Sequence, residues 1–317
     1  MIRRLAVTVL LLASAALAAD PALINLLMPD ARMVAGIDFD RARNTAFGRF
    51  VISQVDQQAD EDLRKLIAMT GFDPRRDIGE ALVATVEMPG PKKSNALVVA
   101  RGNFDVARLT NLAKTEGGAV VASYAGVDIY MGKDSGDNAF AFLGQSVAVA
   151  GDLELVKGAI DRRSGGKGPE AAVAARIRDL SARNELWALT TLPVSSFAHN
   201  VPDRTASGAL KGDALKSIEE AAGGIRLGEA NIEITGEAIT TTEKDAASLA
   251  DVIRFIANMI QLNRNNPETA ELAAIVDTMQ VKAEARKVTV SLSVPEEKIE
   301  KMILQKKTTK KAPSKRV

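Results

Sequence analysis

The pattern of apolar and polar positions predicts short strands that alternate with amphipathic helices. Apolar and polar residues alternate in "ARMVAGIDF", "EALVATVEM" and "NALVVARG", which is typical of strands with one buried face. A helical spacing follows in "NFDVARLTNLAKTEGG", and a meander of short strands then leads to "SVAVAGDLELVKGAI", a strand that turns directly into a helix. The first part of the chain is therefore predicted to be a mixed α and β unit that ends near residue 163.

The second part of the chain loosely repeats this order of elements. The stretches "NELWALTTL", "GGIRLGE" and "ANIEITGEAIT" are predicted strands, and a long helix follows with Leu249, Ile253 and Ile260 on one face. We therefore expect an α+β fold of two similar sub-domains, each an antiparallel sheet with helices mainly on one face. The predicted sub-domains cover residues 19–163 and 184–305, and a polar, glycine-rich stretch suggests a linker region at residues 164–183.

A strand, a tight turn and a helix with an acidic first turn occur at the end of both halves, in "SVAVAGDLELVKGAI" and "KVTVSLSVPEEKIEKMI". A turn that binds phosphate would gain from bare backbone donors and nearby cations, whereas these turns carry carboxylates such as Asp152 and Glu154. We therefore interpret both turns as elements of the fold. The alternation in the second stretch predicts four apolar side chains on one side of its strand, facing Ile299 and Ile303: Val288, Val290, Leu292 and Val294.

The first eighteen residues resemble a secretory signal peptide. Arg3 and Arg4 precede an apolar run at residues 5–12, and Ala16-Leu17-Ala18 has the small residues of a cleavage site. A membrane anchor is the alternative, but the run is shorter than the roughly 20 apolar residues that span a bilayer. We therefore expect cleavage after residue 18, no transmembrane segment in the mature chain, and a periplasmic or secreted protein.

The C-terminal segment, residues 306–317, is predicted to be a disordered basic tail, because it carries six basic residues and almost nothing apolar. The chain has 41 basic and 40 acidic residues. Without this tail and the two arginines of the leader, 33 basic residues remain against 40 acidic ones, so the body carries about −7. This sign makes nucleic acid an unlikely partner of the body, while the tail is expected to make weak contact with anionic surfaces.

Residues that would support catalysis are sparse. The chain has no cysteine, which excludes disulfides, thiolate nucleophiles and cysteine-bound metals. His199, the one histidine, lies near Ser195 and Ser196, but neighbours on one loop rarely form a catalytic triad. Asp38 and Asp40 alternate at a strand end and form a candidate acid–base pair, although Asp40 also fits the role of a helix cap.

Other candidate sites also have simpler interpretations. Asp134, Asp137 and Asn138 share a loop that offers oxygen ligands, but their spacing does not match a calcium-binding loop and suits a hairpin turn. Tyr124 and Tyr130 flank a hairpin and are expected to form a cross-strand cluster in the core. We therefore assign no catalytic, cofactor or metal-binding residue.

Four stretches in the first half resemble, in order, a family of exported bacterial proteins that carry an uncharacterised domain of unknown function. They are "GFDPRRDIGEALVA", "VVARGNFDVARLTNLA", "YAGVDIY" and "VAVAGDLELVKGAID", within residues 31–163. The resemblance implies a fold and export. It implies no activity, and no functional residue is carried over from it.

These observations leave three hypotheses for the function. The first is an exported non-enzymatic binding or scaffold protein of unknown ligand, whose partner is an unknown protein or an apolar ligand. The second is a periplasmic carrier or chaperone for an apolar ligand, which would require a pocket lined by Met and Phe side chains. The third is a hydrolase that uses His199 or the Asp38 and Asp40 pair. No cofactor is expected.

Overall fold

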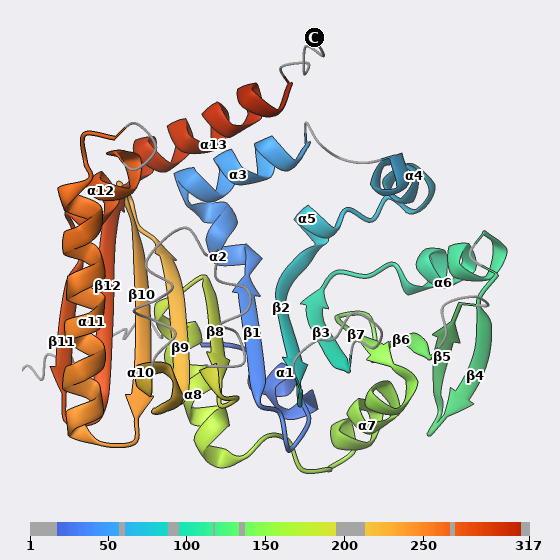
Figure 1. The fold of residues 1–317 in the computed structure, drawn as a ribbon. Coiled ribbons are helices and arrows are strands. Elements are labelled where there is room, and N and C mark those ends of the chain that lie inside the picture. The colour runs from blue at the N-terminus through green and yellow to red at the C-terminus, as the bar shows by residue number, and fades with distance from the viewer. Residues whose placement is uncertain are drawn as a thin grey trace, which may run out of the picture.

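The computed structural model of the protein describes residues 18–56, 61–87, 95–116, 118–132, 137–194, 213–266 and 270–311 (Figure 1). A long sheet runs through these residues and is flanked by helices (Figure 1). The strands are β1 (Met33–Asp38), β2 (Ile78–Thr85), β3 (Ala96–Gly102), β4 (Val120–Tyr124), β5 (Val127–Met131), β6 (Asn138–Phe142), β7 (Val147–Asp152), β8 (Leu186–Thr190), β9 (Ile218–Leu227), β10 (Asn231–Thr240), β11 (Gln280–Glu284) and β12 (Lys287–Pro295). The helices are α1 (Pro21–Leu26), α2 (Phe39–Asn44), α3 (Ala46–Asp56), α4 (Glu61–Thr70), α5 (Pro74–Asp77), α6 (Val106–Thr115), α7 (Leu153–Arg163), α8 (Ala171–Arg183), α10 (Asp213–Lys216), α11 (Glu243–Leu262), α12 (Ala270–Val276) and α13 (Glu296–Lys311).

These strands form a single antiparallel sheet in the order β11-β12-β10-β9-β8-β1-β2-β3-β7-β6-β5-β4. The first half of the chain supplies β1 to β7, and the second half supplies β8 to β12. The two sets of strands meet where β1 pairs with β8, from Met33 opposite Thr190 to Ile37 opposite Leu186. The predicted α+β fold with antiparallel sheets is confirmed, and the two predicted sheets are joined edge to edge.

The two halves follow the same order of strand pairing. In the first half β1, β2 and β3 form a meander, the chain leaves the meander at α6, and β7 returns to pair with β3 before α7. In the second half β8, β9 and β10 form the meander, the chain leaves it at α11, and β12 returns to pair with β10 before α13. The strands β7 and β12, predicted to be equivalent, therefore hold corresponding positions in the sheet.

The two faces of the sheet differ in how they are covered. We call the face that bears Val34, Leu82 and Trp187 the covered face, because α1, α7 and α8 pack on it and form the main hydrophobic core. The opposite face, which bears Ala35 and Val83, we call the open face. Among the described helices, α11 packs over one end of the open face, on β10 to β12, and α6 lies near β6 at the other end.

Helices occupy the two halves differently. In the second half α11 and α13 both pack on the open face, as the prediction of helices mainly on one face requires. In the first half α7 packs on the covered face while α6 faces Phe140 and Phe142 on the open face. Helices cover this face in the first half because the strands β1, β2 and β3 present bulky apolar residues on it, which α1 and α7 bury.

Two predicted segments, the linker region and the basic tail, contain helices. Within the predicted linker region, residues 171–183 form α8, whose Ile177 and Leu180 are fully buried against the sheet. Helix α13 continues to Lys311, six residues into the predicted disordered tail. Its first turns pack through Ile299 and Ile303, and lysine and glutamine extend a helix at little cost once it has begun. Residues 312–317 lie outside the described residues.

The turn between β7 and α7 depends on its glycine rather than on a side-chain cap. Gly151 has φ of +152°, and a Cβ atom there would lie 2.3 Å from the carbonyl oxygen of Ala96 on β3. Asp152 occupies the N-cap position, but its side chain makes no capping hydrogen bond. The turn thus lets β7 pass close to β3, in accord with its predicted role as an element of the fold.

Candidate functional site

A continuous row of apolar residues crosses the open face of the sheet. Residues directly opposite each other on antiparallel strands point to the same face, so the strand registers define which side chains share this row. From β11 to β4 the row contains Val281, Val290, Gly236, Gly223, Ala188, Ala35, Val83, Val98, Ala150, Phe140, Tyr130 and Val121.

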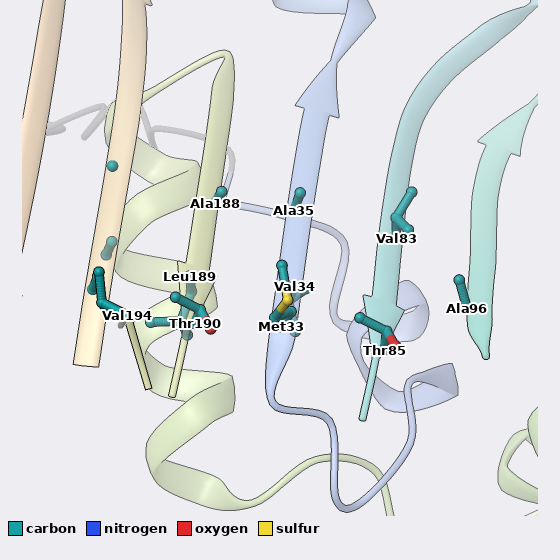
Figure 2. Close-up of a pocket in the computed structure, with 13 residues that line it drawn as sticks. Met33, Val34, Ala35, Val83, Thr85, Ala96, Ala188, Leu189, Thr190 and Val194 are labelled. Atoms are coloured by element: carbon teal, nitrogen blue, oxygen red, sulfur yellow. The ribbon is translucent and has the colours of Figure 1, made fainter. Parts of the chain in front are cut away.

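The middle of the row consists of small residues. Ala188 on β8, Ala35 on β1 and Val83 on β2 lie side by side (Figure 2), and Gly223 on β9 stands directly opposite Ala188. Sheet faces that support a core normally carry bulky β-branched or aromatic side chains, which also favour the strand conformation. Small residues in three adjacent strands, β9, β8 and β1, instead leave a shallow depression in this face of the sheet.

This low region forms two adjoining hollows of about 390 and 440 Å³. Both are lined by Ala35, Val83, Ala188 and Gly223, and these volumes lie in the range of small-molecule sites. We call the combined region the apolar groove. Val83 keeps 41% of its surface exposed there, which is unusual for a valine in the centre of a sheet.

The walls of the apolar groove are formed by larger apolar side chains. Met33 lies beside Ala35 at one end (Figure 2), while Ile37, Leu186 and Ile225 line the other end. Val194 lines the side of the groove where β9 runs (Figure 2). The groove is therefore bounded by hydrocarbon on several sides.

Polar groups are scarce in the groove. None of its lining residues is charged, and its two hydroxyl groups belong to Thr85 and Thr190. The hydroxyl of Thr85 donates to the carbonyl oxygen of Glu87 at 2.7 Å, and that of Thr190 accepts from the amide of Leu192 at 3.1 Å. Both hydroxyls are already engaged, so the groove presents an almost entirely apolar surface.

The groove differs in composition from the predicted Met and Phe pocket. Among its lining residues Met33 is the one methionine, and alanine, valine and glycine predominate. A separate hollow of about 430 Å³ lies between α4, α6 and β6 and does contain Met69, Phe140 and Phe142, together with Lys65 and Glu116. The available signal for the groove was the run of small residues at alternating positions of strands, in "MVAGID", "LWALT" and "AAGGI".

The structure gives Asp38 and Asp40 structural contacts. Asp38, rather than Asp40, caps α2, because its Oδ1 accepts from the amide of Arg41 at 2.8 Å. Asp40 lies in the first turn of α2, forms an ion pair with Arg43 and lies 3.5 Å from Nη2 of Arg101. The cap falls on Asp38 because the strand β1 ends there and the helix begins at the next residue.

The other candidate residues are not brought together in the described part of the chain. Ser195, Ser196 and His199 lie outside the described residues, as does Asp134. The described residues contain no group of three or more His, Cys, Asp or Glu side chains arranged to hold a metal ion.

The two tyrosines do not form the predicted cross-strand cluster. Tyr124 donates to Oδ2 of Asp161 on α7 at 3.0 Å, on the covered face. Tyr130 stacks on Phe140 on the open face, with ring centroids 5.1 Å apart. Tyr124 on β4 stands opposite Val127 on β5 and therefore points to the same face as Val127. Tyr130 lies an odd number of positions after Val127, so it points to the other face, because successive side chains alternate along a strand.

Comparison with known proteins shows similarity in fold alone. No family model matches the chain, and no curated protein matches it, so the resemblance noted for residues 31–163 stays a prediction.

No helix in the described ranges combines the length and the apolar character needed to cross a membrane. Among solved structures, crystal form III of TP0453 superposes with a TM-score of 0.55 at 8% identity, covering 88% of this chain and 96% of that one. Crystal form IV of TP0453 gives a TM-score of 0.52 at 7% identity, covering 88% of this chain and 95% of that one. The sheet and its helices are thus similar in fold to a known architecture.

Proposed function

We propose that the protein is an exported, non-enzymatic binding protein whose apolar groove holds a linear hydrocarbon chain, such as the acyl chain of a lipid. The observation that carries this proposal is the uninterrupted apolar lining formed by Ala35, Val83, Ala188 and Gly223 across four adjacent strands. The signal-like leader at residues 1–18 supports export to the periplasm or the exterior. Weak contact of the basic C-terminal residues with anionic surfaces is retained as a secondary part of the proposal.

The chemistry of the groove favours hydrocarbon over a peptide. A bound peptide brings amide groups that need hydrogen-bond partners, and an apolar site that cannot supply them imposes a cost. The strands beneath the groove pair with each other on both sides, so their backbone groups are already satisfied within the sheet. A hydrocarbon chain has no such groups, and each buried methylene contributes about 0.8 kcal/mol.

Filling the groove is expected to weaken the binding of an acyl probe by at least about tenfold, because displacing two methylenes removes about 1.6 kcal/mol. The substitution Ala188→Phe places a ring on the floor of the groove, where the native side chain is exposed. Binding is measured by titrating the protein from residue 19 onward into a fatty acid that carries a fluorescent dansyl group. Circular dichroism of both proteins checks that the fold is retained.

The matched control is Ala122→Phe, an exposed alanine on β4 that lies outside the groove. This variant is expected to bind the probe like the wild type. Absence of binding to the wild type, or an equal loss in both variants, would contradict the proposed function.

A further inference from the structure

The chain is buried from the first residue that follows the predicted cleavage site. Ala19 is 3% exposed, and Leu23 and Ile24 of α1 are almost completely buried. Helix α1 packs against β3 and α7 and contributes to the main core. The start of the predicted mature chain is therefore an integral part of the fold.

The backbone nitrogen of Ala19 points to a buried hydroxyl group. It donates to Oγ of Ser181 on α8 at 2.8 Å, in a buried contact between residues far apart in the sequence. The same hydroxyl donates to the carbonyl oxygen of Ile177 at 2.7 Å, which leaves its lone pairs directed to Ala19. Ser181 itself is 5% exposed.

A buried carboxylate lies one residue further along the backbone. The amide of Asp20 donates to Oε1 and Oε2 of Glu80 on β2 at 3.3 and 3.2 Å, and the Glu80 side chain is 8% exposed. The nearest described cation, Arg101, keeps its Nε 3.8 Å from Glu80 and also 3.8 Å from Asp20. The negative charge of Glu80 is thus compensated by a neutral amide and by a guanidinium group that is 3.8 Å away and equally close to Asp20.

The charge of the Glu80 carboxylate is only partly compensated by its neighbours. Burial raises the pKa of Glu80 above its usual value, and the neighbouring charges of Asp38 and Asp20 raise it further. The hydrogen bond from Asp20 and the charge of Arg101 lower the pKa but do not offset the burial. A further positive charge beside Glu80 would stabilise the ionised carboxylate.

We propose that proteolytic cleavage between Ala18 and Ala19 creates an α-ammonium group that is bound by Ser181 and Glu80. A signal peptidase hydrolyses the peptide bond: the C–N bond breaks, water supplies hydroxyl to the carbonyl carbon of Ala18 and hydrogen to the nitrogen of Ala19. With an ordinary pKa near 7.7–8.0, the new amine then takes up a proton near neutral pH, and the new acid loses one. This inference rests on the proposed export of the protein but not on the apolar groove.

The α-ammonium group of the cleaved chain differs from the peptide nitrogen of the uncleaved chain in its charge and in its number of hydrogen-bond donors. The peptide nitrogen of an uncleaved chain offers one hydrogen, which Ser181 accepts. An α-ammonium offers three hydrogens and a full charge, so it serves Ser181 and keeps two further donors one residue before the amide of Asp20, which contacts the Glu80 carboxylate. Charge-assisted hydrogen bonds of this kind are roughly twice as strong as neutral ones.

The test compares the chain that begins at Ala19 with the same chain acetylated at its α-amino group, each with Glu80 or with Glu80→Gln. Acetylation leaves one N–H donor and removes the charge. In the wild type we expect acetylation to lower Tm by about 3–6 °C, and in Glu80→Gln by less than half of that, because the partner of the charge is gone.

Equal Tm shifts in the two backgrounds, or no shift in the wild type, would overturn the binding of the α-ammonium group. If Glu80→Gln does not fold, the two wild-type chains are compared at increasing pH, and the Tm difference is expected to shrink as the free amine loses its proton. The amino terminus of the exported protein, read by mass spectrometry, must be Ala19, and any other terminus would overturn the cleavage site. Failure of the groove to bind the acyl probe would contradict the proposed function and leave these outcomes unchanged.

Discussion

Replacing Glu237 with alanine is expected to lower the free energy of unfolding by about 3–5 kcal/mol, the usual cost of removing one partner from a buried ion pair. Glu237 lies on β10 and its side chain is 5% exposed. Its Oε2 lies 2.9 Å from Nη2 of Arg176 and 3.0 Å from Nζ of Lys287, while Arg183 approaches Oε1 at 3.4 Å. The substitution leaves three cations close together without their shared carboxylate.

This cluster also joins the second half of the sheet to α8, the helix between the two halves of the chain. Arg176 on α8 bonds Glu237 on β10 and Glu220 on β9, the latter at 2.8 Å. Chemical denaturation followed by circular dichroism measures the loss. The control is Glu233→Ala on the same strand, whose pair with Arg226 is exposed and 3.6 Å apart, so the expected change is below about 1 kcal/mol. Similar losses in the two variants would contradict the role of the buried cluster.

The effect of Glu237 on stability is expected to depend on pH. Burial raises the pKa of its carboxyl group, but hydrogen bonds and charges from Lys287 and Arg176 outweigh burial and hold the pKa below the usual 4.5. A lowered pKa in the folded state contributes stability that is present above the unfolded pKa and is lost as the pH falls through the folded pKa. The difference between wild type and Glu237→Ala should therefore be constant near neutral pH and shrink below about pH 4.5. A difference that grows on acidification would contradict this assignment.

The elements set by local pattern were predictable from the sequence. The alternation in "KVTVSLSV" places Val288, Val290, Leu292 and Val294 on one face of β12, and the register with β10 confirms it, since they stand opposite Ala238, Gly236, Ile234 and Ile232. The same alternation, followed by a helical spacing, predicts the strand-turn-helix units around β7 and β12. Each depends on residues that are near neighbours in the chain.

The features that depend on distant contacts were not predictable. The pairing of β1 with β8 joins residues about 150 positions apart, and no local pattern records which strand edges meet. The glycine-rich start of the segment around α8 predicts a linker, although Ile177 and Leu180 follow at helical spacing. The apolar groove requires small residues from β1, β8 and β9 to converge, and each of them alone is an ordinary strand residue.

Replacing Trp187 with alanine is expected to destabilise the protein by about 3–5 kcal/mol, because it opens a cavity at the junction of the two halves. Trp187 lies on β8 directly opposite Gly36 on β1, belongs to the main core, and is 5% exposed. A Cβ atom on Gly36 would lie 2.4 Å from Cζ2 and 2.7 Å from Nε1 of the indole ring. The glycine and the tryptophan are therefore fitted to each other across the strand pair.

This fit predicts a specific failure of additivity. Gly36→Ala alone is expected to cost about 1–3 kcal/mol, because the ring cannot move out of a packed core without strain. In the Trp187→Ala background the clash is gone, and the same substitution should be neutral or stabilising by about 0.4–1 kcal/mol through the lower entropy of the unfolded chain. The coupling between the two sites should thus exceed about 1 kcal/mol, as is found for residues in direct contact. Trp187 is the one tryptophan of the chain, so unfolding must be followed by circular dichroism rather than by indole fluorescence. An equal loss of stability on Gly36→Ala in the wild-type and Trp187→Ala backgrounds would contradict the proposed fit. It would show that glycine is required for its backbone conformation and not for the space that it leaves to the indole ring.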